Sequence, residues 1–156
     1  MRAVTIRAVR ISAKEDYAVR AALQLAADGG PLKREQIAQA QDIPAAFLQN
    51  ILIELRHAEI VEAQRGRDGG FRLARPADQI SVADVVRAVS GPLATIRGVR
   101  PPAVEYNETA EPLREVWVAL RTSIRAVLEH VTLADLAANK LPANVRKITG
   151  DPAAWE

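Results

Sequence analysis

The sequence contains no cysteine among its 156 residues. Without thiols, the chain can form no disulfide, no thiolate zinc site and no cysteine-ligated iron–sulfur cluster. Its two histidines, His57 and His130, are too few and too far apart in the sequence to indicate a metal site. We therefore expect no cofactor and no metal, and the absence of cysteine fits a cytoplasmic protein.

Long apolar runs, aromatic residues and an excess of one charge are also missing. No run approaches the roughly 20 apolar residues that span a membrane, and residues 1–10 lack the apolar core of a signal peptide. We expect no membrane partner and interpret residues 1–10 as a short N-terminal tail. Aromatic residues are 4% of the chain, so the core must be aliphatic. The formal net charge is only +2, so a nucleic-acid surface requires local clustering of charge.

The groups that mark most enzymes are absent as well. The chain has no cysteine nucleophile, no metal-ligand cluster, no phosphate-binding loop and no prominent pair of carboxylates. Residues 65–70 superficially look like a phosphate-binding loop, but they include no lysine and no helix is predicted after them. We therefore expect a protein that is not an enzyme.

Positive charge clusters between Gln64 and Pro76, because this stretch contains four arginines and only one aspartate. Residues 60–64 and 71–75 are short strand-like runs. The intervening Asp68, Gly69 and Gly70 favour positive φ and a chain reversal. The pattern predicts a β-hairpin with a basic tip.

An amphipathic helix is predicted just before this hairpin, from Pro44 to about Ala58. Its apolar residues recur at three- and four-residue steps and share one face: Phe47, Leu48, Ile51, Leu52 and Leu55. The residues outside that stripe are Gln49, Asn50, Ile53, Arg56 and His57. A short helix over residues 34–41 and a turn precede it, and a capping box at Ser12 opens a first helix. Two helices, a turn and a basic hairpin are the order of a winged helix-turn-helix.

Each part also has a plainer interpretation. An arginine-rich turn is usually a solvated loop, and an amphipathic helix is usually only packed. The combination in this order is what favours DNA binding over those alternatives.

Two segments together resemble the Rrf2 family of bacterial transcription regulators: Arg65-Gly-Arg-Asp-Gly-Gly-Phe-Arg-Leu-Ala and Ser12-Ala-Lys-Glu-Asp-Tyr-Ala-Val-Arg-Ala. The resemblance covers about residues 10 to 140 and implies a homodimeric winged helix-turn-helix repressor or activator. Several Rrf2 regulators hold an iron–sulfur cluster through three cysteines in the loop before the long helix. The corresponding loop of this chain has none, so sensing by such a cluster is excluded.

The predicted fold class is mainly α with a small β-hairpin wing. We expect a winged domain over residues 11–91, a connecting loop over 92–111, helices over 112–139 and a loose polar tail over 140–156. A capping box at Ser81 predicts a helix over 82–90 with Val82, Val85, Val86 and Val89 inward. The helix from Pro112 to about Val131 carries an apolar stripe that we expect to pack on a second copy: Leu113, Val116, Trp117, Leu120, Ile124, Val127 and Leu128. A purely intramolecular helix is the alternative.

The expected partner is double-stranded DNA with a near-palindromic site, because a homodimer presents each element twice. Gln49 and Asn50 would read base edges, Ala46 could meet a thymine methyl, and Arg56 would hold phosphate. The wing arginines would enter the minor groove. The full set of expected DNA-contacting residues is Lys33, Ala46, Gln49, Asn50, Arg56, Arg65, Gly66, Arg67, Gly69, Gly70 and Arg72, with Arg34 as an alternative to Lys33.

Three further points stay open from the sequence. The loop before the long helix is a candidate site for a small-molecule or protein effector, with Arg97, Arg100 and Tyr106 as its candidate residues. The fold could instead serve a protein-binding adaptor that makes no DNA contact. Glu59 stands where relatives carry glycine or asparagine, and a left-handed backbone there would cost about 1 kcal/mol.

Overall fold

The computed structural model describes residues 10–156, so the predicted tail over residues 1–10 lies almost wholly outside the described residues. The helices are α1 (Ala13–Asp28), α2 (Arg34–Gln41), α3 (Ala45–His57), α4 (Val82–Ser90), α5 (Leu113–Leu128), α6 (Leu133–Ala137) and α7 (Ala143–Thr149). The strands are β1 (Val61–Gln64) and β2 (Gly70–Leu73), and short 3-10 turns cover Ala77–Gln79, Pro101–Ala103 and Pro152–Trp155. The predicted fold class is therefore confirmed. None of the described helices is both long and apolar enough to cross a bilayer.

Side-chain caps set where three of the helices begin. Ser12, Ser81 and Thr132 each accept a hydrogen bond from the backbone amide three residues later, and the carboxylate of that later residue accepts one from the cap amide. Helix α2 has no such cap, as predicted, although the Gln36 side chain accepts a bond from the Lys33 amide at 2.8 Å. Capping alone therefore does not account for α2, which packs through Ile37 into the core.

The winged domain is built on one aliphatic core. Its fully buried members come from all four helices of the domain: Ala18, Ala21 and Ala22 of α1, Ile37 of α2, Leu48, Ile51, Leu52 and Leu55 of α3, and Val85 of α4. Leu133 of α6 joins the same cluster, so the chain returns to the winged domain after α5. This core sets the position of α3 relative to the hairpin.

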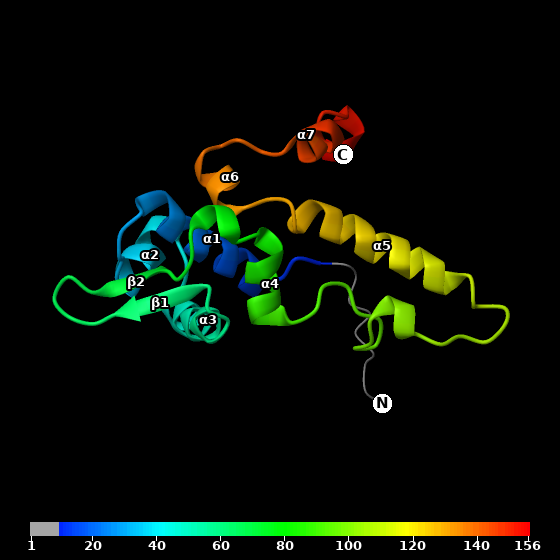
Figure 1. Ribbon diagram of the computed structural model, residues 1–156, viewed down its shortest axis with the longest axis horizontal. Helices are drawn as coiled ribbons and strands as arrows, with labels where there is room; N and C mark the ends of the chain where they lie inside the picture. The colour runs from blue at the N-terminus through cyan, green and yellow to red at the C-terminus, as the bar shows by residue number, and fades with distance from the viewer. Residues whose placement is uncertain (1–9) are drawn as a thin grey trace.

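The hairpin is anchored to the domain by a third segment. Strands β1 and β2 pair antiparallel with Val61 opposite Leu73 and Gln64 opposite Gly70. Leu32 forms a bridge to Phe71, with backbone N···O distances of 2.9 and 2.7 Å. Both strands begin one residue away from their predicted starts, and β2 ends at Leu73 rather than residue 75. Figure 1 shows the hairpin projecting from one end of the molecule.

Helix α5 extends toward the opposite end of the molecule (Figure 1). It buries none of its residues in the described chain, and Leu113 and Val116 are 38% and 54% exposed. One edge of its apolar stripe does meet the chain: Ile124 and Leu128 pack against Ala83, Val86 and Leu93. The other edge, with Val116, Leu120 and Val127, belongs to neither core cluster of the described residues.

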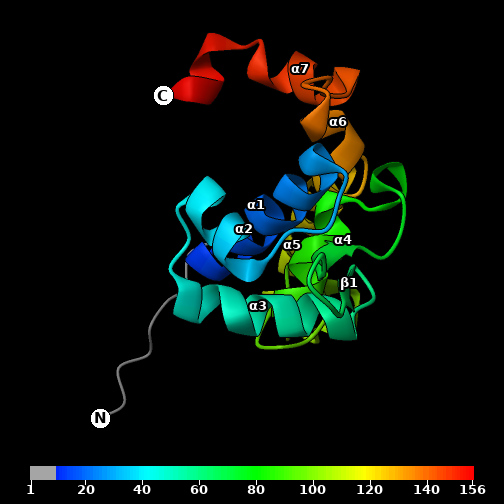
Figure 2. The same ribbon diagram turned by 90° about the vertical axis from the view of Figure 1, so that its left-hand side faces the viewer.

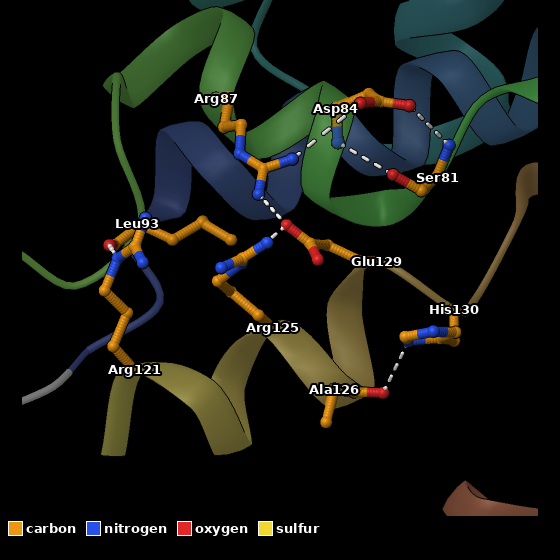
Figure 3. Close-up of polar contacts among 9 residues, drawn as sticks. All are labelled: Ser81, Asp84, Arg87, Leu93, Arg121, Arg125, Ala126, Glu129 and His130. Carbon is orange, nitrogen blue, oxygen red and sulfur yellow. Dashed lines mark hydrogen bonds and ion pairs between the residues drawn. The ribbon is translucent and has the colours of Figure 1, made fainter. Parts of the chain in front are cut away.

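A polar cluster joins the end of α5 to α4 (Figure 3). Glu129 accepts hydrogen bonds from Arg125, at 2.9 Å, and from Arg87 of α4. These two guanidinium groups, Arg125 first, lower the pKa of Glu129 to about 2. Arg121 also donates to the carbonyl of Leu93 at 3.3 Å. The base of α5 is therefore held by charge, while its far half stands free of the winged domain.

Several expectations about single residues need correction. Phe47 is 59% exposed rather than packed with the α3 stripe, and its ring lies 6.2 Å from that of Tyr17. Val82 is only half-buried, and Ala83 takes its place in the interior. Helix α5 ends at Leu128, because residues 129–131 lead into the Thr132 cap of α6. Residues 140–156 are not wholly loose, since they contain α7 and a 3-10 turn.

Candidate nucleic-acid interface

The outer face of α3 is the first part of the candidate interface. Ala46, Gln49, Asn50, Ile53 and Arg56 are all exposed, and their spacing of three and four residues puts them on one side of the helix. The opposite side is the buried stripe of Leu48, Ile51, Leu52 and Leu55. Figure 2 shows α3 along one edge of the molecule, with α1 and α2 on its inner side. The predicted division of this helix is thus present, apart from Phe47.

A groove lies between α3 and the hairpin. Three separate segments line it, with Lys33, Arg34 and Glu35 from the start of α2, Gln49, Leu52, Ile53 and Arg56 from α3, and Gln64, Gly66, Gly69, Gly70 and Phe71 from the hairpin. The structure therefore brings together Lys33, Gln49 and Arg56 with the three wing glycines. Ala46 and Asn50 share the outer face of α3 but do not line the groove itself.

The groove carries more positive than negative charge. Lys33 and Arg56 form no ion pair with any described residue, whereas Arg34 donates to Gln49 and contacts Glu35 at 2.8 Å. Hydrogen bonds from its own backbone amide and from Arg34 lower the pKa of Glu35. Glu35 therefore stays ionised and partly offsets Arg34, so Lys33 and Arg56 are the cations available to an anionic ligand.

The wing tip presents two further arginines. Arg65 and Arg67 are exposed, and neither forms an ion pair within residues 10–156. Gly70 has φ 153°, and a Cβ there would lie 2.5 Å from the carbonyl oxygen of Leu32. A Cβ on Gly69 would lie 2.2 Å from the carbonyl oxygen of Gln64. These two glycines allow the tip to close against the strand before it and against residue 32, which fixes where both arginines project.

Arg72 is placed differently from the other predicted contacts. It lies opposite Glu62 in the hairpin and pairs with it at 2.5 Å. Both residues line a separate depression beside Leu25 and Gly29 at the end of α1, not the groove beside α3. Of the predicted wing residues, Arg72 is thus the one that the structure separates from the others.

The structure also adds residues that were not in the predicted set. Arg34, Ile53 and Gln64 all line the groove. The sequence predicts Arg34 only as an alternative to Lys33. Gln64 could have been predicted as a groove residue from the hairpin register, because it lies opposite Gly70. Lys14, at the start of α1, is paired with Glu54 of α3 at 2.8 Å and does not line the groove.

The candidate effector loop is attached to α5. The Trp117 indole nitrogen donates to the Tyr106 hydroxyl at 3.0 Å, and the Arg97 guanidinium lies 5.9 Å from the centre of the Tyr106 ring. Arg100 is exposed and precedes the 3-10 turn Pro101–Ala103. Tyr106 and Trp117 therefore link the loop to the N-terminal half of α5.

Comparison with known proteins gives the same description from the whole chain. Residues 11–139 match the Rrf2 family, which is described as "Iron-dependent Transcriptional regulator". A protein of Mycobacterium tuberculosis (strain H37Rv), named as an HTH-type transcriptional regulator, is 47% identical over 150 residues, covering 95% of this chain and 93% of the relative. The HTH-type transcriptional regulator CymR of Bacillus subtilis is 33% identical over 132 residues, covering 83% and 90%.

Solved structures agree with these sequence matches. The structure of CymR, described as the global cysteine regulator of B. subtilis, has a TM-score of 0.72 at 30% identity and covers 85% of this chain and 98% of its own. The structure of T. potens IscR has a TM-score of 0.68 at 29% identity, with coverage of 84% and 88%. The family and these relatives are transcriptional regulators and not enzymes.

The family description names iron, and the residues of this chain do not suit a cysteine-ligated cluster. The complete sequence has no cysteine. Among the described residues, no group of three or more histidine, cysteine, aspartate or glutamate side chains could hold a metal ion. In the loop before α5, the side chains that interact are Arg97, Tyr106 and, across on the helix, Trp117, which offer no thiolate. No role for an iron–sulfur cluster follows from these residues.

Proposed function

This chain belongs to the Rrf2 family of transcriptional regulators, and we propose that it binds double-stranded DNA as a homodimer at a near-palindromic operator. The observation that carries this proposal is the groove in which the outer face of α3 and the basic hairpin meet. Because its relatives are bacterial regulators, we also place its action in the cytoplasm, with the chromosome.

Helix α3 supplies the residues for reading bases in the major groove. Gln49 and Asn50 are exposed amides one turn from the helix start, where recognition helices contact base edges. An amide pairs best with adenine, at roughly 1–3 kcal/mol for a good bidentate contact. Ala46 lies on the same face, in reach of a thymine methyl. Arg34 holds the Gln49 oxygen in the free protein, so DNA binding must compete with or reuse that bond.

The wing supplies contacts beside the major groove. Arg65 and Arg67 are exposed at a tip whose shape is fixed by Gly69 and Gly70. Guanidinium groups on a rigid projection are suited to the narrow minor groove of A·T-rich DNA. Lys33 and Arg56 line the groove from the start of α2 and from α3, where they could contact phosphates of the DNA backbone.

Helix α5 supports the homodimer. Val116 is 54% exposed, and Leu120 and Val127 on the same edge are only half-buried and belong to neither core cluster of the described residues. An apolar helical face of this kind is normally buried, and a second copy of the same helix provides a matching surface. Two copies related by a two-fold axis would present α3 and the wing twice, which requires a near-palindromic site.

Repression is the mode of regulation that requires the fewest binding surfaces on the molecule. A dimer bound across a promoter blocks polymerase by occupancy, whereas activation needs an additional surface for polymerase. The loop before α5 is where we place any effector, small molecule or protein. Its residues Tyr106 and Trp117 contact each other, so a change in the loop would be transmitted directly to α5.

The decisive experiment joins operator selection with a wing variant. Genomic fragments are selected by the purified protein, and a palindrome is expected among those recovered. The double variant Arg65→Ala/Arg67→Ala should bind the selected site at least about 100-fold more weakly and show a smaller dependence on salt, because up to four positive charges per dimer are removed from the DNA contact.

The matched control for this experiment is Arg72→Ala. It removes a positive charge from the same hairpin, but at a residue paired with Glu62 and facing away from the groove. We expect it to bind within about threefold of the unaltered protein. Binding by the double variant that equals wild type, or recovery of no enriched DNA, would favour a protein-binding adaptor instead.

A further inference from the structure

A contact between the two helices of the helix-turn-helix determines what one recognition residue offers to DNA. Arg34, the first residue of α2, donates a hydrogen bond from its Nη1 atom to the side-chain oxygen of Gln49 in α3. A guanidinium group carries only N–H donors, so the Gln49 atom that faces it has to be the oxygen and not the amide nitrogen. The hydrogen bond therefore fixes which end of the Gln49 amide is turned away from Arg34.

Arg34 is itself held in place. Its Nη2 atom donates to Glu35 at 2.8 Å, its Nε atom is buried, and its side chain is 39% exposed. The preceding residue, Lys33, is exposed and forms no ion pair within residues 10–156. Arg34 is thus a fixed part of the groove wall, whereas the Lys33 side chain is free to follow a phosphate.

Gln49 presents mainly N–H donors once its oxygen is turned toward Arg34. Gln49 is exposed, and its amide nitrogen donates to no other described residue. Both side chains line the groove between α3 and the hairpin. The guanidinium group has no acceptor to add to the amide. The surface that the pair offers to a ligand therefore consists mainly of hydrogen-bond donors.

The base edges of the major groove discriminate between such a pair and a free amide. Adenine presents the N7 acceptor beside the N6 amino donor, which matches an amide that is free to use both its nitrogen and its oxygen. Guanine presents two acceptors, N7 and O6, which match a surface of donors. Against the Arg34–Gln49 pair, the adenine amino group would meet N–H groups and lose a hydrogen bond. Asn50 forms no side-chain hydrogen bond with the described residues, so its amide still matches adenine.

We propose that Arg34 and Gln49 act as one unit that reads guanine in the operator half-site. Gln49 is the residue that contacts the base, and Arg34 is the positioning residue that turns the Gln49 oxygen away from it. This inference rests on the proposed operator binding and deepens it, because Arg34 then selects a base instead of only adding charge. The base expected opposite Gln49 becomes guanine, while the base expected opposite Asn50 remains adenine.

Base preference at single operator positions tests this unit. The operator selected by the purified protein is changed symmetrically to each base pair at each half-site position, and binding is measured by fluorescence anisotropy. Gln49→Met keeps the length of the side chain but has no amide, so the position where it loses preference is the one that Gln49 reads. At that position the wild-type protein should bind guanine about tenfold more tightly than adenine. Arg34→Ala frees the amide to turn and should abolish this ratio or reverse it in favour of adenine.

Two further variants separate positioning from charge. Lys33→Ala removes a positive charge from the same segment without touching Gln49, and it should weaken binding to all operator variants alike. In the Gln49→Met background, Arg34→Ala should leave the ratio of guanine to adenine binding unchanged, because Arg34 acts through Gln49.

Several results would overturn the unit while leaving operator binding intact. They are a wild-type preference for adenine at the position read by Gln49, a ratio that Arg34→Ala does not change, and no loss of preference at any position in Gln49→Met. A ratio that Lys33→Ala shifts as strongly as Arg34→Ala would show an effect of charge and would also overturn it. A protein that selects no DNA would overturn the proposed function and this inference together.

Discussion

Helices α3 and α5 carry similar apolar stripes, yet the structure treats them in opposite ways. In α3, Leu48, Ile51, Leu52 and Leu55 are each at most 1% exposed, because α1, α2 and α4 surround them. Helix α5 is longer, with 16 residues against 13, and buries none of them. Helix α3 buries its apolar face inside its own domain, whereas one edge of the apolar face of α5 remains exposed to solvent.

The difference shows what a stripe of apolar residues does and does not predict. It predicts that one face will be buried, but not which chain supplies the cover. For α3 the remaining face is polar and open, which suits a ligand such as DNA. For α5 the open edge is itself apolar, with Val116 54% exposed, which suits a second protein surface.

The sharpest test of the contrast places a charge on the open edge of α5. Leu120→Glu should raise the dissociation constant of the dimer roughly 100-fold or more, since a carboxylate would be buried without a partner. Sedimentation equilibrium measures the change, and operator binding should fall with it. Thr122→Glu, on the exposed opposite side of the same helix, is the control and should dimerise normally. If Leu120→Glu also dimerises normally, α5 is not the interface.

The corresponding change in α3 should act on folding and not on association. Leu55 is fully buried, so Leu55→Ala should lower the free energy of unfolding by about 2–5 kcal/mol. Urea unfolding followed by circular dichroism measures this loss. Val116→Ala is the matched truncation in α5. It should lower the free energy of unfolding by an amount that depends on protein concentration, because Val116 is buried only in the dimer. A large loss of unfolding free energy for Val116→Ala in dilute monomer would show that Val116 is buried within its own chain, as Leu55 is.

Much of the winged domain could be predicted because local signals and tertiary packing agree in it. The predicted limits of α2 and α4 match the structure, since Asp42, Ser81 and Gly91 provide local stops and caps. Phe47 was misplaced because periodicity alone cannot show where an inward stripe ends. The ring lies at the first turn of α3, beyond the reach of the core.

The remaining differences concern contacts made at a distance along the chain. Nothing local shows that Arg72 pairs with Glu62, because the pair depends on hairpin register. The sequence does not predict helix α7, because residues 140–156 are polar and contain two prolines, a composition typical of a loose tail. Pro142 stands just before α7, where a proline is compatible with helix initiation.

The end of α3 offers a test of smaller size. Glu59 has φ 57°, in the left-handed region, and the Ile60 amide donates to the Leu55 carbonyl at 2.9 Å. Glycine tolerates this left-handed backbone, so Glu59→Gly should raise the free energy of unfolding by about 1 kcal/mol. Glu59→Ala is the control and should give no such gain, because alanine keeps the same steric conflict. Urea unfolding distinguishes the two, and an equal gain from both would rule out backbone strain as the cause.

The smallest expected effect lies at the junction of the two regions, where Glu129 joins α5 to α4 (Figure 3). Arg125 and then Arg87 lower the pKa of Glu129 from 4.5 to about 2 in the folded protein. The folded chain therefore binds this proton more weakly than the unfolded chain. The resulting stabilisation is complete above about pH 4.5 and is lost as the pH falls toward the folded value.

Glu129→Gln removes this charge and should remove its pH dependence. The difference in urea midpoint between wild type and the variant should be small at neutral pH, because Glu129 is only partly buried and solvent still screens its ion pairs, and should narrow between about pH 5 and about pH 3. Glu115→Gln is the matched control, since Glu115 lies on the same helix and forms no ion pair with described residues. A constant difference across this range would mean that Glu129 holds α5 by packing rather than by charge. Apolar packing would then hold both α3 and α5 on the winged domain, and the two helices would differ only in how much of their surface is buried.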